Sequence, residues 1–448
     1  MIAALRQKLT IIYYFVLARW LLSLKSAKKV RKIQNRGIAR HFHYLKKHSP
    51  HFATAPVITS IADLSQLPVT DKQTMMAQFN HTNTLGLDRD TALKIAIQSE
   101  RDRNFRPTYQ GVSVGLSSGT SGHRGLFVIS PQEQAAWTGT VLAKFLPRGQ
   151  LLVPHRIAFF LRANNNLYES VGSKRIEFRY FDVYQDMNHH IAQLRDYQPT
   201  ILVAPPSVLT VIAESIESGQ LRLQPQKVIA VAEVLTEFDK ENFRRVFQQD
   251  LIFQAYQCTE GFLAYTCEAG SLHLNEEFVY VEKSFIDDSR FVPILTDFTR
   301  KTQPIIRYRL NDILVLGRQA CPCGSATTVL DRIEGREDDV FLFARADGST
   351  IKVFPDVIGR CIVLTEGIKQ YRVIQTTPST VEVHVQPRAP KTEAAITAEF
   401  HRISTQLDFL PVKLSFHDYQ PDLSRKLKRI ERKATVDGSA ITTTDTSY

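Results

Sequence analysis

Short apolar runs alternate with amphipathic stretches between residues 157 and 256. The runs have the length and composition of buried strands, and the stretches between them have the apolar spacing of helices. Strands that alternate with helices predict an α/β fold with a largely parallel sheet, whose ligands bind beyond the carboxyl ends of the strands. The predicted strands are 157–161, 200–204, 227–232 and 251–256, and the predicted helices are 207–218 and 237–249.

A charged stretch at 335–339, which we expect to be exposed, marks the boundary of a second domain. Beyond it, strands at 371–376 and 381–386 and a helix around 394–407 are predicted, which indicates a small α+β domain. A chain of 448 residues exceeds the usual size of one core, so several domains are expected. We expect a basic helical segment (1–62), a large domain (63–337), a small domain (338–436) and a disordered Ser/Thr-rich tail (437–448).

Positive charge is concentrated at the beginning of the chain. Residues 1–62 contain twelve Lys and Arg and no Asp or Glu, and subtracting these twelve from the net charge of +11 leaves −1 for the rest. An apolar run at 11–24, interrupted by Arg19, is too short and too charged for a confident transmembrane helix. With Trp20 and other aromatic residues among its cations, the run resembles an interfacial helix that binds anionic lipid. The alternative is that this helix packs on the rest of the protein.

Several other classes are disfavoured. A signal peptide is not expected, because Arg19 interrupts the apolar run and no clear small-residue cleavage site follows. Nucleic acid is not an expected partner, because no helix-turn-helix, zinc-finger or RNP pattern accompanies the basic residues. Five cysteines are too few for the disulfide framework of a small secreted protein, which favours a cytoplasmic location, with peripheral membrane contact through the basic segment as an option.

A loop at 115–125 reads Gly-Leu-Ser-Ser-Gly-Thr-Ser-Gly-His-Arg-Gly. Glycine lets the backbone approach a ligand closely, and successive N–H groups can surround an anion. A solvated turn is the alternative, and a kinase or GTPase loop is disfavoured because no Lys-Ser or Lys-Thr pair follows Gly122. The candidate phosphate-binding residues are Ser117, Ser118, Gly119, Thr120, Ser121 and Gly122.

Candidate ligands of a nucleotide follow further along the chain. Glu260 comes just after a predicted strand and could hold Mg²⁺ against phosphate oxygens. Asp312 could accept hydrogen bonds from both hydroxyls of a ribose. A basic run at 424–429 contains Lys426 near the end of the small domain. Taken singly, an aspartate more often caps a turn and such a lysine more often lies on a solvated face, so the argument rests on their joint order.

This ordered set resembles the adenylate-forming superfamily, and within it the branch of phenylacetate-CoA ligases and coenzyme F390 synthetases, over roughly residues 65–433. The resemblance implies a large adenylate-forming domain and a small mobile C-terminal domain. It implies that the Ser/Thr/Gly loop binds the phosphates of ATP, that Asp312 binds ribose and that Lys426 is the mobile catalytic lysine. Other matches are the magnesium motif with Tyr256, Thr259 and Glu260, the adenine-binding segment with Ala232 and Glu233, and the hinge motif with Arg336.

The sequence departs from the family pattern at three places. Gln257 replaces a glycine of the magnesium motif, the loop ends at Arg124–Gly125 without the usual lysine, and no glycine precedes Lys426. None of these changes removes Asp312, Glu260 or Lys426, so an active enzyme is expected.

The resemblance implies a reaction in two halves. A carboxylate attacks the α-phosphate of ATP, with Mg²⁺ and Lys426 offsetting negative charge, and an acyl- or aryl-adenylate forms. The acyl group then commonly passes to a thiol, of CoA or a carrier protein, after the small domain rotates near Asp338. We expect an aromatic or otherwise apolar acid as substrate. The alternatives are transfer of AMP to a phenolic hydroxyl and a non-catalytic nucleotide-binding scaffold.

Cys267, His273, Cys321 and Cys323 form a separate set of metal-ligating residue types. Three thiolates and one imidazole are a common ligand set of structural zinc. The Cys-x-Cys spacing is less diagnostic than Cys-x-x-Cys, although Pro322 and Gly324 favour a tight turn. Structural zinc is therefore the hypothesis, with free thiols as the alternative.

Overall fold

The computed structural model describes residues 2–22, 24–105, 107–117, 125–147, 149, 153–162, 172–173 and 175–433. The chain forms two compact units. The first contains the residues up to 333 together with 423–426, and the second contains 334–422 and the described residues from 427 on.

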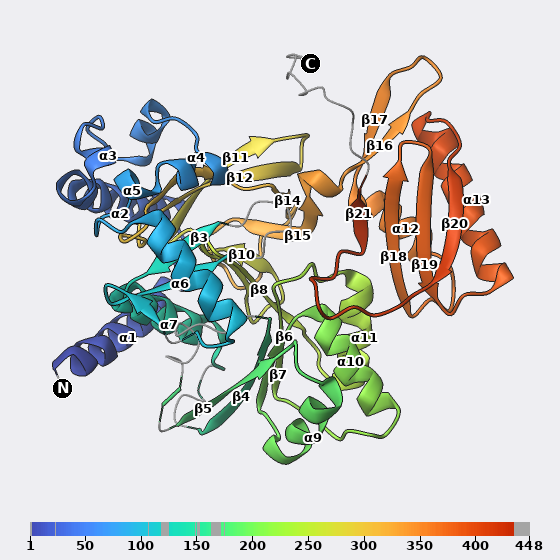
Figure 1. Cartoon of the computed structure of the whole chain (residues 1–448), viewed down its shortest axis with the longest axis horizontal. Coiled ribbons are helices and arrows are strands. Elements are labelled where there is room, and N and C mark those ends of the chain that lie inside the picture. Colours follow the sequence, from blue (N-terminus) through green and yellow to red (C-terminus); the bar gives the residue numbers. More distant parts are fainter. Residues whose placement is uncertain are drawn as a thin grey trace. The chain divides into compact units, whose positions relative to one another are not determined.

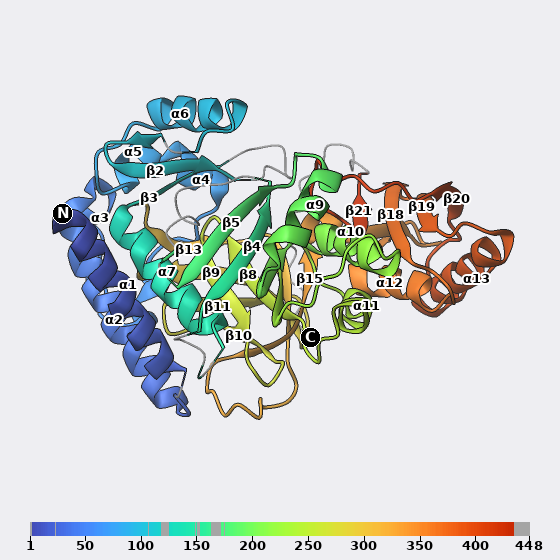
Figure 2. The same ribbon diagram turned by 90° about the horizontal axis from the view of Figure 1, so that it is seen from below.

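Two long helices begin the first unit, α1 (Ile2–Leu21) and α2 (Ala27–His48). One side of α1 packs against α7 (Pro131–Phe145), and Figure 2 shows the two helices near the same edge of this unit. A Cβ on Gly139 would lie 2.4 Å from the carbonyl oxygen of Ile11, so only glycine permits this approach. Among the described residues, no helix combines the length and the apolarity needed to cross a membrane.

Short helices and a small sheet follow. Asp71 caps one of these helices, because its carboxylate accepts a hydrogen bond from the backbone N–H of Thr74 at 2.8 Å. The elements are α3 (Pro50–Ala53), η1 (Ile61–Gln66), α4 (Lys72–Ala77), α5 (Phe79–Thr82), α6 (Arg89–Arg101), β1 (Thr108–Tyr109), β2 (Val112–Leu116) and β3 (Leu126–Ile129).

The largest sheet has twelve strands among the described residues, and its first part is the predicted α/β unit. Strands β5, β4, β6, β7 and β8 lie next to one another in that order, and every neighbouring pair is parallel. The bounds are β4 (His155–Leu161), β5 (Ile176–Asp182), α9 (Met187–Tyr197), β6 (Ile201–Ala204), α10 (Pro206–Glu217), β7 (Lys227–Val231), α11 (Glu237–Phe247) and β8 (Phe253–Cys258). The four predicted strands and both predicted helices are therefore confirmed.

Alternate side chains of these strands are buried on opposite faces of the sheet. Ala158, Phe160 and Val228 pack in one core with α9, α10 and α11, which lie beside β6 and β7 in Figure 1. Phe159 and Ile229 pack in the other core with α7. Burial on both faces explains why these strands read as continuous apolar runs.

The remaining strands of the sheet form antiparallel pairs. These pairs are β8 with β9, β9 with β10, β10 with β15, β11 with β12, β12 with β13 and β12 with β14. The expectation of a mostly parallel sheet is wrong for this part, because a turn of only two residues joins β8 to β9 and a hairpin results. The strands are β9 (Gly261–Thr266), β10 (Leu272–Leu274), β11 (Val279–Phe285), β12 (Arg290–Asp297), β13 (Ile305–Arg309), β14 (Asp312–Leu316) and β15 (Val329–Arg336).

The second unit is a small α+β structure, as predicted. Its four-stranded sheet has the order β20-β19-β18-β21. The expectation that the whole stretch 335–339 is exposed is wrong for Asp339, which is 5% exposed and accepts a hydrogen bond from Lys428 Nζ at 2.8 Å. The elements are η2 (Glu337–Asp339), β16 (Phe341–Ala344), β17 (Thr350–Val353), α12 (Pro355–Val363), β18 (Gln370–Thr377), β19 (Thr380–Gln386), α13 (Pro390–Leu407), β20 (Lys413–Asp418) and β21 (Ile430–Arg432). The predicted tail at 437–448 lies outside the described residues.

A buried histidine of α2 makes the stability of the fold depend on pH. His41 is 2% exposed, neither ring nitrogen has a hydrogen-bond partner among the described residues, and burial lowers its pKa from 6.5 to about 3. Between these values the unfolded chain takes up a proton that the folded chain excludes, so stability falls as pH falls.

We therefore predict that His41 costs about 1.4 kcal/mol of stability per pH unit below pH 6.5. Urea unfolding at a series of pH values should show a shallower loss for His41→Leu than for the wild type. His43→Leu, at an exposed position of the same helix, should keep the wild-type slope. Identical slopes for His41→Leu and the wild type would contradict the assignment.

Candidate functional site

Polar side chains follow the carboxyl ends of four parallel strands. Arg162 follows β4, Ser207 follows β6, Glu233 follows β7 and Glu260 follows β8. Because these strands are parallel, their carboxyl ends lie at one edge of the sheet, near the labels β6, β7 and β8 in Figure 1. Parallel sheets bind ligands at this edge, so the predicted residues Glu233 and Glu260 lie where a site is expected.

The end of β8 is joined to the beginning of β14 by one short hydrogen bond. The Tyr256 hydroxyl donates to Asp312 Oδ2 at 2.5 Å. Burial and the neighbouring Asp312 carboxylate raise the pKa of Tyr256 well above its usual value, so the hydroxyl stays protonated and remains a donor. Two of the predicted site residues, 56 positions apart, thus share one location.

Glu260 lies in the turn between β8 and β9. It is 7% exposed, and its Oε2 accepts a hydrogen bond from the Thr259 hydroxyl at 2.9 Å. Burial and the charge of Glu260 raise the pKa of Tyr308, which also hydrogen-bonds this carboxylate. A Cβ on the next residue, Gly261, would lie 3.0 Å from Asp297 Oδ2, so a larger residue there would have to displace this carboxylate slightly. A single carboxylate that shares a cation with substrate phosphates is a usual Mg²⁺ arrangement, so Glu260 fits the predicted role.

The neck of the Ser/Thr/Gly loop lies at the tip of the β2–β3 hairpin. Ser117 and Gly125 close this neck through two hydrogen bonds of 2.7 Å, one from Ser117 N–H to the Gly125 carbonyl and one from Gly125 N–H to Ser117 Oγ. The predicted phosphate-binding residues Ser118, Gly119, Thr120, Ser121 and Gly122 lie outside the described residues.

Arg300 connects the loop hairpin to the magnesium motif. It is 7% exposed, and its guanidinium donates to the carbonyl oxygens of Thr259 at 3.1 Å and of Val128, on β3, at 3.2 Å. Sequence analysis did not identify Arg300, because its role depends on two partners that are distant in the chain.

A lysine that the sequence analysis did not identify lies beside the neck of the loop. Cγ and Cδ of Lys72, at the beginning of α4, lie 3.5 Å from the position that a Cβ on Gly125 would occupy. The family pattern places a lysine at the end of this loop and the present sequence does not. The aliphatic part of Lys72, from another element, therefore lies against the same neck.

Arg162 connects the predicted adenine-binding segment to the segment that contains Lys426. Its guanidinium lies 2.9 Å from Glu233 Oε1 and donates to the carbonyl oxygens of Leu423, at 3.0 Å, and Arg425. The Glu233 side chain is fully buried and also accepts hydrogen bonds from Ser207 N–H and Oγ. Glu233 thus acts as an anchor, and the only sequence signal for Arg162 was a cation directly after a predicted strand.

The predicted residues Lys426 and Arg336 fall in different units. Lys426 belongs to the first unit, together with residues 423–425, and Arg336 belongs to the second. Ala232 precedes the anchor Glu233 and has a left-handed backbone with φ 67°, which turns the chain sharply after β7.

The Cys and His residues come together as predicted. One ligand atom from each of Cys267, His273, Cys321 and Cys323 lies within 4.8 Å of the others. The two sulfurs of Cys267 and Cys321 are 3.5 Å apart, and His273 Nε2 is 3.4 Å from Cys323 Sγ. Ligands of tetrahedral zinc are separated by about 3.5–3.8 Å, given Zn–S and Zn–N bonds of about 2.3 and 2.0 Å.

The surroundings of His273 suit a metal as well. Nδ1 lies 3.1 Å from Thr327 Oγ1 and 3.3 Å from the Thr327 carbonyl oxygen, which leaves Nε2 directed towards the cysteines. Such a hydrogen bond on the distal nitrogen orients a metal-binding imidazole. The residues therefore fit zinc.

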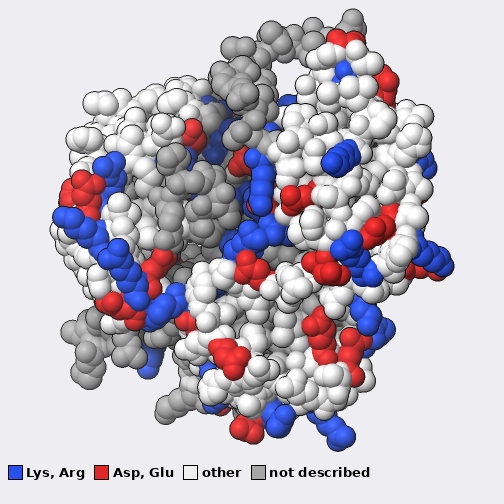
Figure 3. Space-filling model, turned by 45° about the vertical axis from the view of Figure 1, so that its right-hand side comes forward, with Lys and Arg blue, Asp and Glu red and all other residues white. Residues whose placement is uncertain are grey.

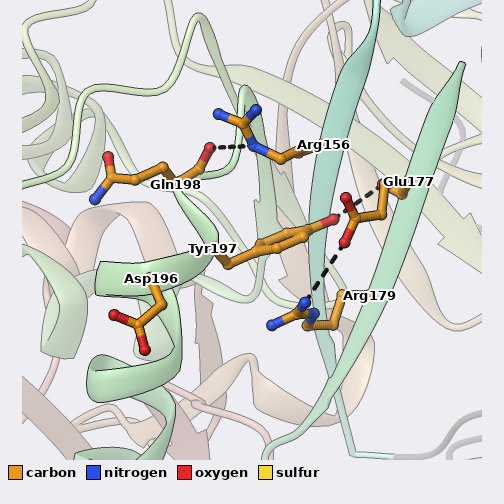
Figure 4. Close-up of a pocket in the computed structure, with 6 residues that line it drawn as sticks. All are labelled: Arg156, Glu177, Arg179, Asp196, Tyr197 and Gln198. Carbon is orange, nitrogen blue, oxygen red and sulfur yellow. Dashed lines mark hydrogen bonds and ion pairs between the residues drawn. The ribbon is translucent and has the colours of Figure 1, made fainter.

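A surface pocket of the first unit lies away from this edge. Arg156 and Glu177 are the second residues of β4 and β5, so the pocket in Figure 4 lies at the amino ends of these strands. Its groups bind one another: the Tyr197 hydroxyl donates to the Glu177 carbonyl at 3.0 Å, and the Arg179 guanidinium lies 4.1 Å from the Tyr197 ring. The pocket is not part of the candidate nucleotide site.

Comparison of sequences gives one distant relative. No protein-family model matches the chain. The chain is 22% identical over 378 residues to protein CapK of Staphylococcus aureus, with 78% of this chain and 76% of CapK covered.

Comparison of structures gives the fold. A structure of 2-hydroxyisobutyryl-CoA ligase with R3-HIB-AMP, in the postadenylation state, has a TM-score of 0.68 at 17% identity and covers 92% of this chain and 90% of the ligase. The amide bond synthetase McbA of Marinactinospora thermotolerans has a TM-score of 0.52 at 12% identity, with 71% of this chain and 67% of McbA covered. The chain therefore has the fold of these two solved enzymes over most of its length.

Proposed function

We propose that this protein is an ATP-dependent ligase that activates a carboxylic acid as its acyl- or aryl-adenylate. The observation that carries the proposal is the hydrogen bond between Tyr256 and Asp312, which brings the predicted magnesium and ribose motifs to one place. Arg300 and Arg162 extend this grouping to the loop hairpin and to the segment before Lys426.

The nucleotide would lie along the carboxyl edge of the parallel strands. Asp312, oriented by the Tyr256 hydroxyl, would accept hydrogen bonds from the ribose. The turn at Ala232, fixed by the buried anchor Glu233, would lie beside the adenine. Ser117 and the loop residues that follow it would surround the phosphates.

Charge neutralisation would drive the first half-reaction. Mg²⁺ held by Glu260 would offset negative charge on the departing pyrophosphate. Lys426 would stabilise the charge that develops at the α-phosphate, and the Arg162 hydrogen bonds to Leu423 and Arg425 would limit the motion of its segment. Arg336 and the neighbouring hinge motif would serve the rotation of the small domain before the second half-reaction.

Aromatic side chains favour an aromatic or apolar acid. Phe178 and Tyr180 of β5 and Trp137 of α7 are partly buried against the same core. Trp137 donates its indole N–H to Gln257 Oε1 at 2.8 Å, so the residue that replaces the motif glycine has a polar partner next to this core. The acceptor we propose is a thiol, of CoA or a carrier protein, as in the phenylacetate-CoA ligase branch that the motifs resemble.

ATP–pyrophosphate exchange with a panel of aromatic and fatty acids tests the central step. We predict acid-dependent exchange in the wild type and a fall of about 100- to 1,000-fold in Lys426→Ala, because a charge that stabilises the transition state is lost. Lys391→Ala, at an exposed position of α13, is the matched control and should exchange normally.

Exchange that is unchanged in Lys426→Ala would contradict the role of this lysine. Tight ATP binding without exchange for any acid would instead favour AMP transfer to a hydroxyl or a binding scaffold.

Lys72 should supply the cation that the loop sequence lacks. We predict that Lys72→Ala raises the KM for ATP by about tenfold or more, since a charge-assisted hydrogen bond contributes about 1.5–3 kcal/mol, while Lys72→Arg retains most of the affinity. Lys94→Ala, on exposed α6, is the control. An unaltered KM in Lys72→Ala would refute the assignment.

We also propose that this unit binds a structural zinc ion. Its ligands would be Cys267, His273, Cys321 and Cys323. Elemental analysis should find about one zinc per chain, and Cys321→Ala should lose it. Cys361→Ala, a buried cysteine outside the cluster, should keep it. Purified wild-type protein without zinc, and with a melting temperature insensitive to added zinc and chelator, would favour free thiols.

A further inference from the structure

Helix α1 carries an unbroken apolar stripe on its outward side. Its members are spaced by three or four residues, apart from one adjacent pair, and therefore occupy about 100° of the helix circumference. They are Leu5, Leu9, Ile12, Tyr13, Val16 and Trp20, and each is between 58% and 60% exposed. We refer to these six residues as the α1 stripe.

The opposite side of α1 is already used by the fold. Ala18 and Leu21 are buried, and the backbone around Ile11 and Phe15 approaches Gly139 of α7 so closely that a Cβ there would lie 2.4 Å from Ile11 O and 2.9 Å from Phe15 N. Rotation of α1 would destroy this close approach. The α1 stripe is therefore held outward by the packing of the helix, and it is not a face that the first unit itself can bury.

Positive charge borders the stripe. Arg6 and Lys8 are exposed and fall on either side of it at 100° per residue. The first acidic residue of the chain is Asp63. The face in Figure 3, by contrast, intersperses lysine and arginine with aspartate and glutamate. Helix α2 adds the exposed cations Lys28, Lys29, Arg31, Lys32, Arg36, Arg40 and Lys47.

We propose that the α1 stripe binds an anionic lipid surface, with α1 lying in the plane of the interface. An apolar face that contains Trp20 and Tyr13 and is bordered by cations matches the boundary between acyl chains and acidic headgroups. A second copy of the chain is a poorer occupant, because residues 1–62 of that copy contain no acidic residue that could neutralise the cations bordering the stripe. The proposal is independent of the catalytic assignment.

Vesicle flotation of the full chain tests this surface. The protein should float with phosphatidylcholine vesicles that contain about one-third phosphatidylglycerol, and bind pure phosphatidylcholine more weakly. The double variant Ile12→Gln/Val16→Gln should bind at least about tenfold more weakly, because two apolar side chains no longer enter the lipid. Arg6→Gln and Lys8→Gln should each weaken binding to anionic vesicles about fivefold.

Two controls distinguish lipid binding by the stripe from misfolding and from nonspecific hydrophobic adsorption to the vesicles. Val57→Gln/Leu364→Gln removes two apolar side chains that are 71% and 57% exposed elsewhere, and it should bind like the wild type. The chain contains two tryptophans, Trp20 and Trp137. Brominated lipid should quench the wild type but not Trp20→Phe, whose remaining indole is bound to Gln257.

Equal flotation of the wild type and the Ile12→Gln/Val16→Gln variant would overturn the proposal. So would a concentration-dependent dimer, seen by sedimentation without lipid and abolished in that variant, if the wild type fails to float. If the variant unfolds at the same temperature as the wild type, its loss of binding reflects the changed stripe and not misfolding.

Discussion

The hydrogen bond from Tyr256 to Asp312 is the contact on which the candidate site depends. It forms because β8 ends beside the beginning of β14, although these residues lie 56 positions apart. Tyr256 is buried and Asp312 is partly buried, and a bond to a charged acceptor is stronger in such surroundings than at the surface. The turn that carries Glu260 is held in addition by the Arg300 hydrogen bond to the Thr259 carbonyl.

The helical layer at the beginning of the chain is part of the same structure. Helix α7 packs on one face of the parallel strands and receives α1 on its other side, at Gly139. The connection after α1 reaches the Cys/His cluster, because Ala326 N–H donates to the Leu24 carbonyl at 3.0 Å and Lys25 lies beside Gly324. A metal in that cluster would therefore support the turn from which α2 begins.

Four of the five parallel strands, the helices α10 and α11 and the Cys/His cluster could be predicted from the sequence, because apolar runs and ligand residue types leave a local signal, whereas β5 and α9 were missed. The antiparallel strands of the large sheet were not predicted, because β9 follows β8 after only two residues and β10 has only three residues, so neither stands out as a separate apolar run between helices. Asp339 was expected to be exposed, since its burial depends on Lys428 much later in the chain. Arg162, Arg300 and Lys72 were missed for the same reason: their partners are distant in sequence.

Oxygen transfer from acid to nucleotide tests the central claim most directly. An acid that supports turnover would carry ¹⁸O in its carboxylate, and a thiol acceptor would be present. The mass of the AMP that is released would then be measured by mass spectrometry. Attack of the carboxylate on the α-phosphate, followed by cleavage of the acyl C–O bond, predicts AMP with one ¹⁸O. Unlabelled AMP would show that the acid never bonds to phosphorus and would contradict the account.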